Sequence, residues 1–556
     1  MMKKYKIATL SLLYLPIIAL AQNVGIGTTS PMAKLHIKGT ADTTQLVIQA
    51  FSTQSPSKPL LKFLAGDGST LLSVHAFKDN ILLGRNNAPN ATTGYKNILI
   101  GTDAGAGITT GYFNYLLGDE AGKALNAGYE NIGIGQKVMR NVTTGTYNVC
   151  IGSNILANGL SSSTSSNTAV GSYALNTAGG NFNTAVGTYA MANCGVDAAS
   201  NTAIGNYALN GFYTPNTGSG NTAVGIYSMY VNTSGSNNAA VGSFSLQYNS
   251  SGGNNAALGV QSLFYNRTGS YNVALGYNSL FGNISASYNT AAGSFSLGSN
   301  TTGIGNVAIG YNAMPANTEG SYNTAVGYNA LRTINSQFNT AVGYAAGNNY
   351  NNGYNNVFVG AGADVNGADY YNVIAIGQGT IVGGPSTARF GNSSTVSYGG
   401  WANWTNISDG RFKTDVRENV PGLNFITKLR PVTYRLKVKE LDDFQHQGMH
   451  KETDKDSQAA MDNAMAEKEK ITYTGFIAQE VEDAALASGF NFSGVDKPKS
   501  PTDVYGLRYA EFVAPLVKAV QEQQDIIARQ KNKIEDLQHM VDDLQKEITL
   551  ITQPAK

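Results

Sequence analysis

Apolar and polar positions alternate in a short unit that recurs along the middle of the chain. One copy is Asn-Thr-Ala-Val-Gly-Tyr-Asn-Ala-Leu at Asn323–Leu331, and its glycine returns mostly at intervals of 17 residues. An asparagine stands four residues before this glycine in every copy but the last, where it shifts to Asn372. A fixed period of this length indicates stacked supersecondary units. The glycines are Gly101, Gly118, Gly135, Gly152, Gly171, Gly187, Gly205, Gly225, Gly242, Gly259, Gly276, Gly293, Gly310, Gly327, Gly343, Gly360 and Gly377.

Each unit is too short for a pair of helices, is rich in strand formers and is closed by turn residues. The pattern therefore predicts a mainly β protein whose shaft is a β-solenoid with one coil per unit. The alternating Ala and Val or Ile are expected to point into a thin core, the glycine to allow a tight corner, and the asparagine to form a ladder. The inward positions include the residue before each glycine, as at Val224, Val241, Val326 and Val342. Coils about 4.8 Å apart give a rod roughly 80 Å long.

The pattern changes on both sides of the shaft. Short strands are expected between residues 35 and 85, and the sequence after Ser408 is typical of an α/β region. Within that region, Leu429–Leu436 predicts a strand, and Gly475–Glu482 leads from a strand into a helix. We expect a signal peptide at 1–21, a β-rich head at 22–95, the shaft at 96–380, a linker at 381–407, an α/β domain at 408–515, and a coiled coil with a tail at 516–556.

One helix is predicted from Tyr505 to about Ile551. Its apolar residues follow a 3-4 spacing, and Gln523 and Gln530 occupy remaining core positions. A lone helix would leave this stripe in water, so a parallel coiled coil is expected. β-branched residues at a with Leu at d favour two strands. The stripe consists of Val520, Ile527, Ile534, Leu537, Val541, Leu544, Ile548 and Ile551.

Charge is scarce in the shaft and balanced in the whole chain. The net charge is +1, and the only charged side chain between Asn201 and Asn300 is Arg267. Nucleic acid or an anionic membrane surface is therefore not an expected partner. A hundred residues with so little charge require a repetitive architecture whose surface consists of Asn, Thr, Ser and Tyr.

The first residues have the composition of an export signal. A basic start with Lys3 and Lys4 precedes the apolar stretch Ile7–Leu20, and Ala19-Leu20-Ala21 fits a cleavage site. A membrane anchor is the alternative, but the stretch is short for a span. The sequence thus predicts a secreted or cell-surface protein with no membrane span after signal cleavage.

Ser408 and Lys413 are the candidate catalytic residues, because they lie where the uncharged repeat gives way to a charged module. A serine is a poor nucleophile until a base takes its proton, and a lysine can serve as that base if its pKa is lowered. Elsewhere the sequence offers few residues that could catalyse a reaction or bind a metal. Cys150 and Cys194 are expected to be small buried residues rather than a disulfide framework. His446 and His450 lack a third ligand, so the charged insertion 439–470 is expected to be a solvated linker or helix, and no metal or cofactor is expected.

Four runs carry a resemblance to a known family: Ser408-Asp409-x-Arg411-x-Lys413, Leu429–Val432, Gly475–Val481 and Tyr509–Lys518. They resemble the intramolecular chaperone auto-processing domain of endosialidase-type phage tail spikes, also found in myelin regulatory factor. The resemblance covers about residues 406–551. It implies a homotrimeric chaperone that helps the upstream fibre to fold and then cuts itself off before Ser408, with Ser408 as the nucleophile and Lys413 as the general base. The insertion 439–470 departs from the compact family pattern.

The shaft repeats resemble the head repeats of trimeric autotransporter adhesins, which form left-handed β-rolls. Both resemblances favour a trimer over the two-stranded alternative. The main hypothesis is an exported tail-fibre-like or adhesin-like protein that acts as a serine endopeptidase on its own chain. A structural adhesin whose C-terminal domain remains as a trimerisation cap is the alternative. An enzyme acting on a glycan ranks far below, because no carboxylates are paired in the repeat. The surface ligand of such a fibre is not identified by the sequence.

Overall fold

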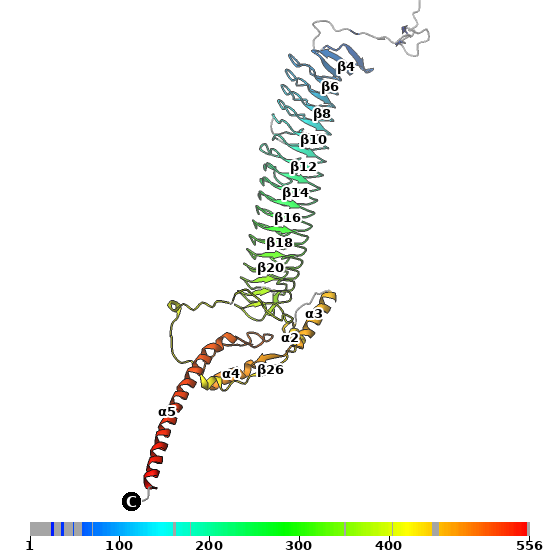
Figure 1. Ribbon diagram of the computed structural model, residues 1–556. Coiled ribbons are helices and arrows are strands. Elements are labelled where there is room, and N and C mark those ends of the chain that lie inside the picture. Colours follow the sequence, from blue (N-terminus) through cyan, green and yellow to red (C-terminus); the bar gives the residue numbers. More distant parts are fainter. Residues whose placement is uncertain are drawn as a thin grey trace, which may run out of the picture.

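A long stack of strands forms most of the protein, and a smaller helical region follows it (Figure 1). Helix α5 (Val513–Ile551) projects from that region as a single rod. The computed structural model describes residues 24–26, 35–37, 48, 58–68, 70–159, 163–177, 179–349, 352–402, 404–447 and 455–552. The predicted signal peptide at 1–21 lies outside the described residues.

The stack is a β-solenoid of about 18 turns, which confirms the predicted fold class. Each turn contributes a short strand that pairs in parallel and in register with the next, so that Thr324, Ala325 and Val326 lie beside Thr340, Ala341 and Val342. The successive strands are β5 (Asn80–Leu83), β6 (Ile98–Ile100), β7 (Tyr115–Leu117), β8 (Ile132–Ile134), β9 (Val149–Ile151), β10 (Thr168–Val170), β11 (Thr184–Val186), β12 (Thr202–Ile204), β13 (Thr222–Val224), β14 (Ala239–Val241), β15 (Ala256–Leu258), β16 (Val273–Leu275), β17 (Thr290–Ala292), β18 (Val307–Ile309), β19 (Thr324–Val326), β20 (Thr340–Val342), β21 (Val357–Val359), β23 (Ile374–Ile376) and β25 (Ala388–Phe390).

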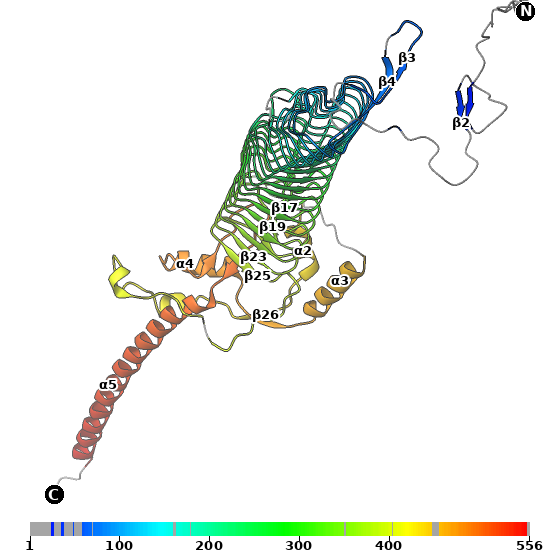
Figure 2. The ribbon, with the colours of Figure 1, turned by 90° about the horizontal axis from the view of Figure 1, so that it is seen from above.

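Antiparallel strands begin the stack, in the segment where the sequence predicts a β-rich head. Strand β3 (Leu61–Leu64) pairs with β4 (Thr70–Phe77), which pairs with β5. Farther toward the N-terminus, β1 (Val24–Ile26) and β2 (Leu35–Ile37) form a separate parallel pair. Figure 2 shows the β3–β4 hairpin at the blue end of the stack.

The residue before each glycine points outward, so the prediction that Val224, Val241, Val326 and Val342 point inward is wrong. Val342 is 40% exposed, whereas the alanine before it in the strand, Ala341, is fully buried. Side chains alternate across a strand, so only one of two adjacent residues can face the core. The strands contribute buried alanines to the core, and the turns that follow the glycines contribute larger buried residues such as Met229 and Leu331.

The repeat glycine lies where successive coils come into close backbone contact. Gly327 has a φ of +138°, and a Cβ atom there would lie 2.3 Å from the carbonyl oxygen of Gly343 in the next coil. Any larger residue would therefore meet both an unfavourable backbone conformation and a backbone atom that cannot move aside. This confirms the predicted tight corner and adds a second reason for the glycine.

Two ladders of buried asparagines run along the solenoid. The predicted one includes Asn323, whose Nδ2 donates to Oδ1 of Asn306 at 3.1 Å and to the carbonyl oxygen of Ser336 at 2.7 Å. The repeat pattern did not lead us to expect the second ladder, which lies seven residues after the glycine. There, Nδ2 of Asn317 donates to Oδ1 of Asn300 at 2.8 Å and to the carbonyl oxygen of Gly320 at 2.9 Å. Both ladders satisfy backbone groups in the turns that a thin core would otherwise leave unpaired.

The stack continues into the segment 381–407 that the sequence assigns to a linker. Strand β25 extends the parallel ladder, and the two-residue strands β22 (Asp364–Val365) and β24 (Ile381–Val382) pair beside it. These last coils lack the full repeat motif, yet their apolar residues Val365 and Val382 still lie in the same core. Strand pairing and burial therefore extend the solenoid beyond the recognisable repeat.

Asp364 is a fully buried carboxylate at this end of the solenoid. Its oxygens accept hydrogen bonds from the backbone N–H groups of Val365 at 2.8 Å and Asn349 at 2.9 Å. Burial outweighs these bonds and raises the pKa of Asp364 to about 7. The folded protein therefore holds a proton between about pH 4 and pH 7 that the unfolded chain releases.

Stability should accordingly fall as the pH rises from about 4 to about 7 and then level off, since stability declines wherever the folded state binds more protons. Thermal unfolding followed by circular dichroism at several pH values measures this trend. Because an asparagine side chain cannot titrate, the Asp364→Asn variant should lose this part of the slope, even if it melts at a lower temperature throughout. Equal slopes for the parent and the variant would contradict the assignment.

A small α/β region follows the solenoid. Strands β26 (Val432–Tyr434) and β27 (Tyr473–Gly475) pair antiparallel and lead into α4 (Ala478–Ala487), as predicted. Buried phenylalanines Phe425, Phe492 and Phe512 form its core with α4. The remaining elements are η1 (Gly410–Phe412), α1 (Leu423–Ile426), α2 (Val438–Gln445), α3 (Lys455–Glu469), β28 (Val495–Asp496), β29 (Gly506–Leu507) and η2 (Tyr509–Phe512).

The long helix begins at Val513, not at Tyr505 as the sequence predicts. Gly506 and Leu507 instead pair with Asp496 and Val495 as strand β29. Pro515 follows in the first turn of the helix, where a missing backbone N–H breaks no intrahelical hydrogen bond. Strand β29 and the 3₁₀ helix η2 thus occupy residues that the apolar spacing assigns to the long helix.

Candidate functional site

The two predicted catalytic residues are in direct contact. The Lys413 ammonium Nζ donates a hydrogen bond to Oγ of Ser408 at 2.7 Å. A single 3₁₀ turn, η1, lies between them and closes with hydrogen bonds from Phe412 N to Asp409 O and from Lys413 N to Gly410 O, at 3.1 and 3.2 Å. A 3₁₀ helix completes one full turn in about three residues. Two residues five apart therefore meet across it, and local structure is enough to form the pair.

Asp409 caps this turn. Its Oδ1 accepts a hydrogen bond from the backbone N–H of Arg411 at 2.9 Å, as a favourable N-cap residue does. The Arg411 guanidinium also binds the same carboxylate and holds the pKa of Asp409 below its usual value. The guanidinium of Arg411 is thus directed at Asp409.

Solvent surrounds the pair in the single chain. Ser408 and Lys413 are both exposed, as are nearly all residues from 405 to 419. Several large apolar side chains close to the pair in the sequence are also at least 79% exposed, which is unusual for residues of this type. They are Trp401, Trp404, Ile407, Phe412 and Val416.

The other three family motifs meet in the α/β core. The Arg430 guanidinium pairs with the Glu480 carboxylate at the start of α4, with Nε and Oε2 3.0 Å apart. The Tyr509 hydroxyl accepts a hydrogen bond from the backbone N–H of Phe476 at 3.2 Å. Glu522 of α5 accepts one from the backbone N–H of Leu423 at 2.7 Å, which ties α1 to the long helix. Motifs that lie far apart in the sequence thus hold one compact unit together.

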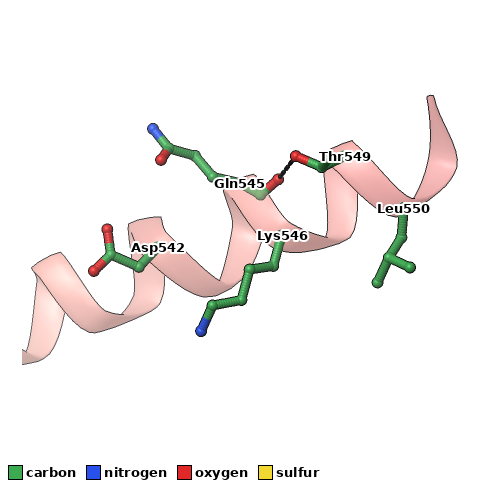
Figure 3. A pocket seen from close by; sticks show the side chains of 5 residues that line it. All are labelled: Asp542, Gln545, Lys546, Thr549 and Leu550. Atoms are coloured by element: carbon green, nitrogen blue, oxygen red, sulfur yellow. Dashed lines mark hydrogen bonds between the residues drawn. The ribbon is translucent and has the colours of Figure 1, made fainter. Parts of the chain in front are cut away.

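The apolar stripe of α5 is not covered within one chain. Only Pro515 and Ala519 of the helix are buried, and every residue of the stripe from Val520 to Ile551 is at least 46% exposed. A hollow on the last turns is lined by side chains of this one helix, so it is a feature of an unpaired helix surface rather than an enclosed pocket. Figure 3 shows its residues, Asp542, Gln545, Lys546, Thr549 and Leu550.

The other candidate reactive residues lie away from the Ser408–Lys413 pair. Cys150 and Cys194 are free thiols buried in the solenoid, and burial raises the pKa of each. Nδ1 of His446 lies 2.8 Å from the carbonyl oxygen of Asp442, whereas His450 lies outside the described residues. Within the described part of the chain, no three His, Cys, Asp or Glu side chains are grouped to hold a metal ion. Nor does any described helix combine the length and apolar character needed to cross a bilayer.

Comparison with known proteins gives one family for the C-terminal region. The family model described as chaperone of endosialidase matches residues 408–489, a segment that begins at Ser408 and ends just after α4. No curated protein matches the chain. The match supports a tail-spike-like protein with a C-terminal chaperone. Residues 408–489 therefore match the chaperone-of-endosialidase family, as the sequence motifs predict.

Proposed function

We propose that this protein is an exported trimeric fibre, tail-fibre-like or adhesin-like, whose C-terminal chaperone assists assembly and then cleaves itself off before Ser408. The observation that carries the proposal is the 2.7 Å contact between Lys413 Nζ and Ser408 Oγ. The family match to a chaperone supports it from the sequence side. The mass of the protein recovered after expression without residues 1–21 tests it directly, because cleavage leaves two fragments of defined mass.

The chemistry requires only the chain itself and one water molecule. Lys413 in its neutral form takes the proton of the Ser408 hydroxyl, and Oγ attacks the carbonyl carbon of Ile407. The Ile407–Ser408 peptide bond breaks as the amide nitrogen leaves with a proton, and Ile407 is then esterified to Oγ of Ser408. Water hydrolyses the ester, which yields a carboxylate on Ile407 and a free amino group on Ser408.

Assembly would supply the trigger for this reaction. A lysine is an effective base only where burial or a nearby cation lowers its pKa, and Ser408 and Lys413 lie in solvent in the single chain. The exposed apolar residues beside the pair and the uncovered stripe of α5 favour contacts with further copies of the chain. Three chains that join through α5 would bring these surfaces together and could enclose the pair.

The double substitution Ile534→Asp with Leu537→Asp tests this link. Both residues belong to the stripe of α5, so two carboxylates would be buried without partners if the helices pair. We expect a monomer that stays uncut, measured by light scattering together with denaturing gel electrophoresis. A matched substitution off the stripe, Lys546→Asp, should leave both assembly and cleavage intact. Normal cleavage in a monomeric double mutant would show that the site forms within one chain.

A fibre that never cleaves is the second candidate. The exposure of the Ser408–Lys413 pair in the single chain favours it, because both side chains lie in solvent there and no neighbouring side chain encloses them. In that case the C-terminal region would act as a permanent trimerisation cap, and only full-length protein would be recovered from an assembled sample.

A further inference from the structure

The charged insertion after β26 lies against the end of the solenoid. Both ribbon views place α2 and α3 beside the last coils, on the side away from the N-terminal strands (Figures 1 and 2). Val438 and Asp442 of α2 and Met465 of α3 are each no more than 2% exposed. This insertion was expected to be a solvated linker or helix, and the structure corrects that expectation because one face of it is buried.

Polar contacts fix the insertion to the residues just after β25. Oδ1 of Asp442 accepts a hydrogen bond from Oγ of Ser393 at 2.7 Å. Nζ of Lys468 donates to the carbonyl oxygens of Ser393 and Thr395, at 2.6 and 2.7 Å. Burial lowers the pKa of Lys468, in agreement with its position between the two surfaces. A charged group that donates to two carbonyl oxygens in a partly buried site is a strong and specific contact.

A second part of the α/β region, the loop before β29, contacts the same end of the solenoid. The Lys499 ammonium donates to Oγ1 of Thr387 at 2.9 Å, and the Arg389 guanidinium lies 3.7 Å from the Asp503 carboxylate. Gly383 is in close contact with this loop, because a Cβ atom there would lie 2.2 Å from Oδ1 of Asp503. The solenoid end is therefore shaped to receive the loop.

The two surfaces face each other across a cavity of about 260 Å³ with walls from both sides. A solenoid that ends without a cover exposes its core and an unpaired strand edge, so capping elements are the general solution. The insertion and the loop together have the position of such a cap. The cavity is lined by Ile381, Arg389 and Tyr398 from the shaft side and by Val438, Leu441 and Lys468 from the module.

The two sides of these contacts lie on opposite sides of the proposed cleavage site in the sequence. Every shaft residue that takes part, from Gly383 to Thr395, precedes Ser408, and every contacting residue of the α/β region, from Asp442 to Asp503, follows it. Cleavage of the Ile407–Ser408 bond would sever the covalent connection and none of the contacts. We name this set of contacts the shaft-end clamp.

We propose that the C-terminal fragment stays bound to the shaft through the shaft-end clamp after the chain is cut, as a permanent cap on the solenoid. This proposal rests on the proposed function in one respect, because self-cleavage before Ser408 is the event that would cut the chain in the protein itself. The partner of the clamp surface is the last coils of the same chain. Cleavage would then release the constraint of the connecting segment without releasing the chaperone itself.

A cut made by an added protease tests the clamp without relying on self-cleavage. In the full chain with Ser408→Ala, a specific protease site inserted after Gly400 lies in an exposed segment whose neighbours leave open space. After digestion under native conditions, the two fragments should elute as one peak in size-exclusion chromatography. Two separate peaks would overturn the proposal.

Three further variants on this background identify the contacts responsible. Lys468→Glu places a carboxylate against two carbonyl oxygens, and Gly383→Glu places one against Asp503, so each should separate the fragments after digestion. Lys470→Glu is the matched control, because Lys470 lies two residues farther on, is exposed and pairs with Glu467 of the same module. Uncut samples that elute alike show that the variants fold. Co-elution in both clamp variants would refute the assigned contacts.

The natural cut separates this proposal from the proposed function. If the parent protein cleaves itself and its fragments part, the clamp is wrong and the self-cleavage stands. If the parent never cleaves but the protease-cut fragments remain together, the clamp stands and the self-cleavage is wrong.

Discussion

Ser408→Ala and Lys413→Ala are each expected to leave one full-length band where the parent protein gives two fragments that meet at the Ile407–Ser408 bond. The alanine at 408 removes the hydroxyl nucleophile that contacts Lys413, and the alanine at 413 removes the base. Loss of a general base slows such a reaction by about 10²–10⁴-fold. Intact mass measured over a time course after assembly would resolve both effects, and the C-terminal fragment should begin with Ser408.

The Lys413→Arg variant distinguishes a lysine that acts as the general base from a lysine that only makes a structural hydrogen bond. Arginine keeps the positive charge and can still donate to the Ser408 hydroxyl, but it stays protonated and cannot accept a proton. The variant should therefore assemble and remain uncut. Lys437→Ala, at an exposed lysine whose ammonium pairs with Glu440, should cleave like the parent. Cleavage of the Lys413→Arg variant at the rate of the parent would rule out the lysine as the base.

Ala325→Asp should damage the shaft far more than Val326→Asp, although the two positions are adjacent. Ala325 is fully buried between Ala308 and Ala341 of the neighbouring coils. A carboxylate there would have no partner, and an unpaired buried charge costs about 3–5 kcal/mol. Val326 lies on the outer face of the strand, where a substitution usually changes the stability by only about 0.5 kcal/mol.

Thermal unfolding followed by circular dichroism measures this difference between the two variants. Because each coil contacts mainly its neighbours, the damage from Ala325→Asp should appear as a low-temperature loss of part of the strand signal rather than a shift of the whole transition. The pair serves as its own control, since the change in charge is the same. Equal destabilisation by both substitutions would contradict the inside–outside assignment of the strand.

Local features of the sequence carried the prediction of the candidate site. The turn between Ser408 and Lys413 needs only a capping aspartate, a glycine and hydrogen bonds within five residues, so the motif by itself brings the pair together. The shaft is similar. A glycine with an asparagine four residues before it repeats in register, and stacking of identical units makes every copy meet its own equivalent. One asparagine ladder followed directly from that pattern.

Other features depend on contacts that the pattern does not contain. The second ladder, at Asn300 and Asn317, was missed although its residues also recur every 17 positions, because only the folded coil shows which turn carbonyls need a donor. The direction of Val326 was assigned to the core from its apolar character. The pleat of the strand decides otherwise, since Ala325 beside it already occupies the core.

The sequence by itself determined the solenoid, the residue period of its coils and the pairing of Ser408 with Lys413, because each arises from contacts between near neighbours or between identical repeats. Only the tertiary structure decided that the solenoid continues to Phe390 and that the insertion at α2 and α3 covers its end. The contacts that cover the end join segments about 50 to 140 residues apart, such as Ser393 with Asp442 and Asn366 with Thr502. Strand β25 pairs with β23 close by in the sequence, but its coil lacks the repeat motif. The many charged residues of the insertion led us to expect that solvent surrounds it. In the structure one face of the insertion is buried against the shaft instead.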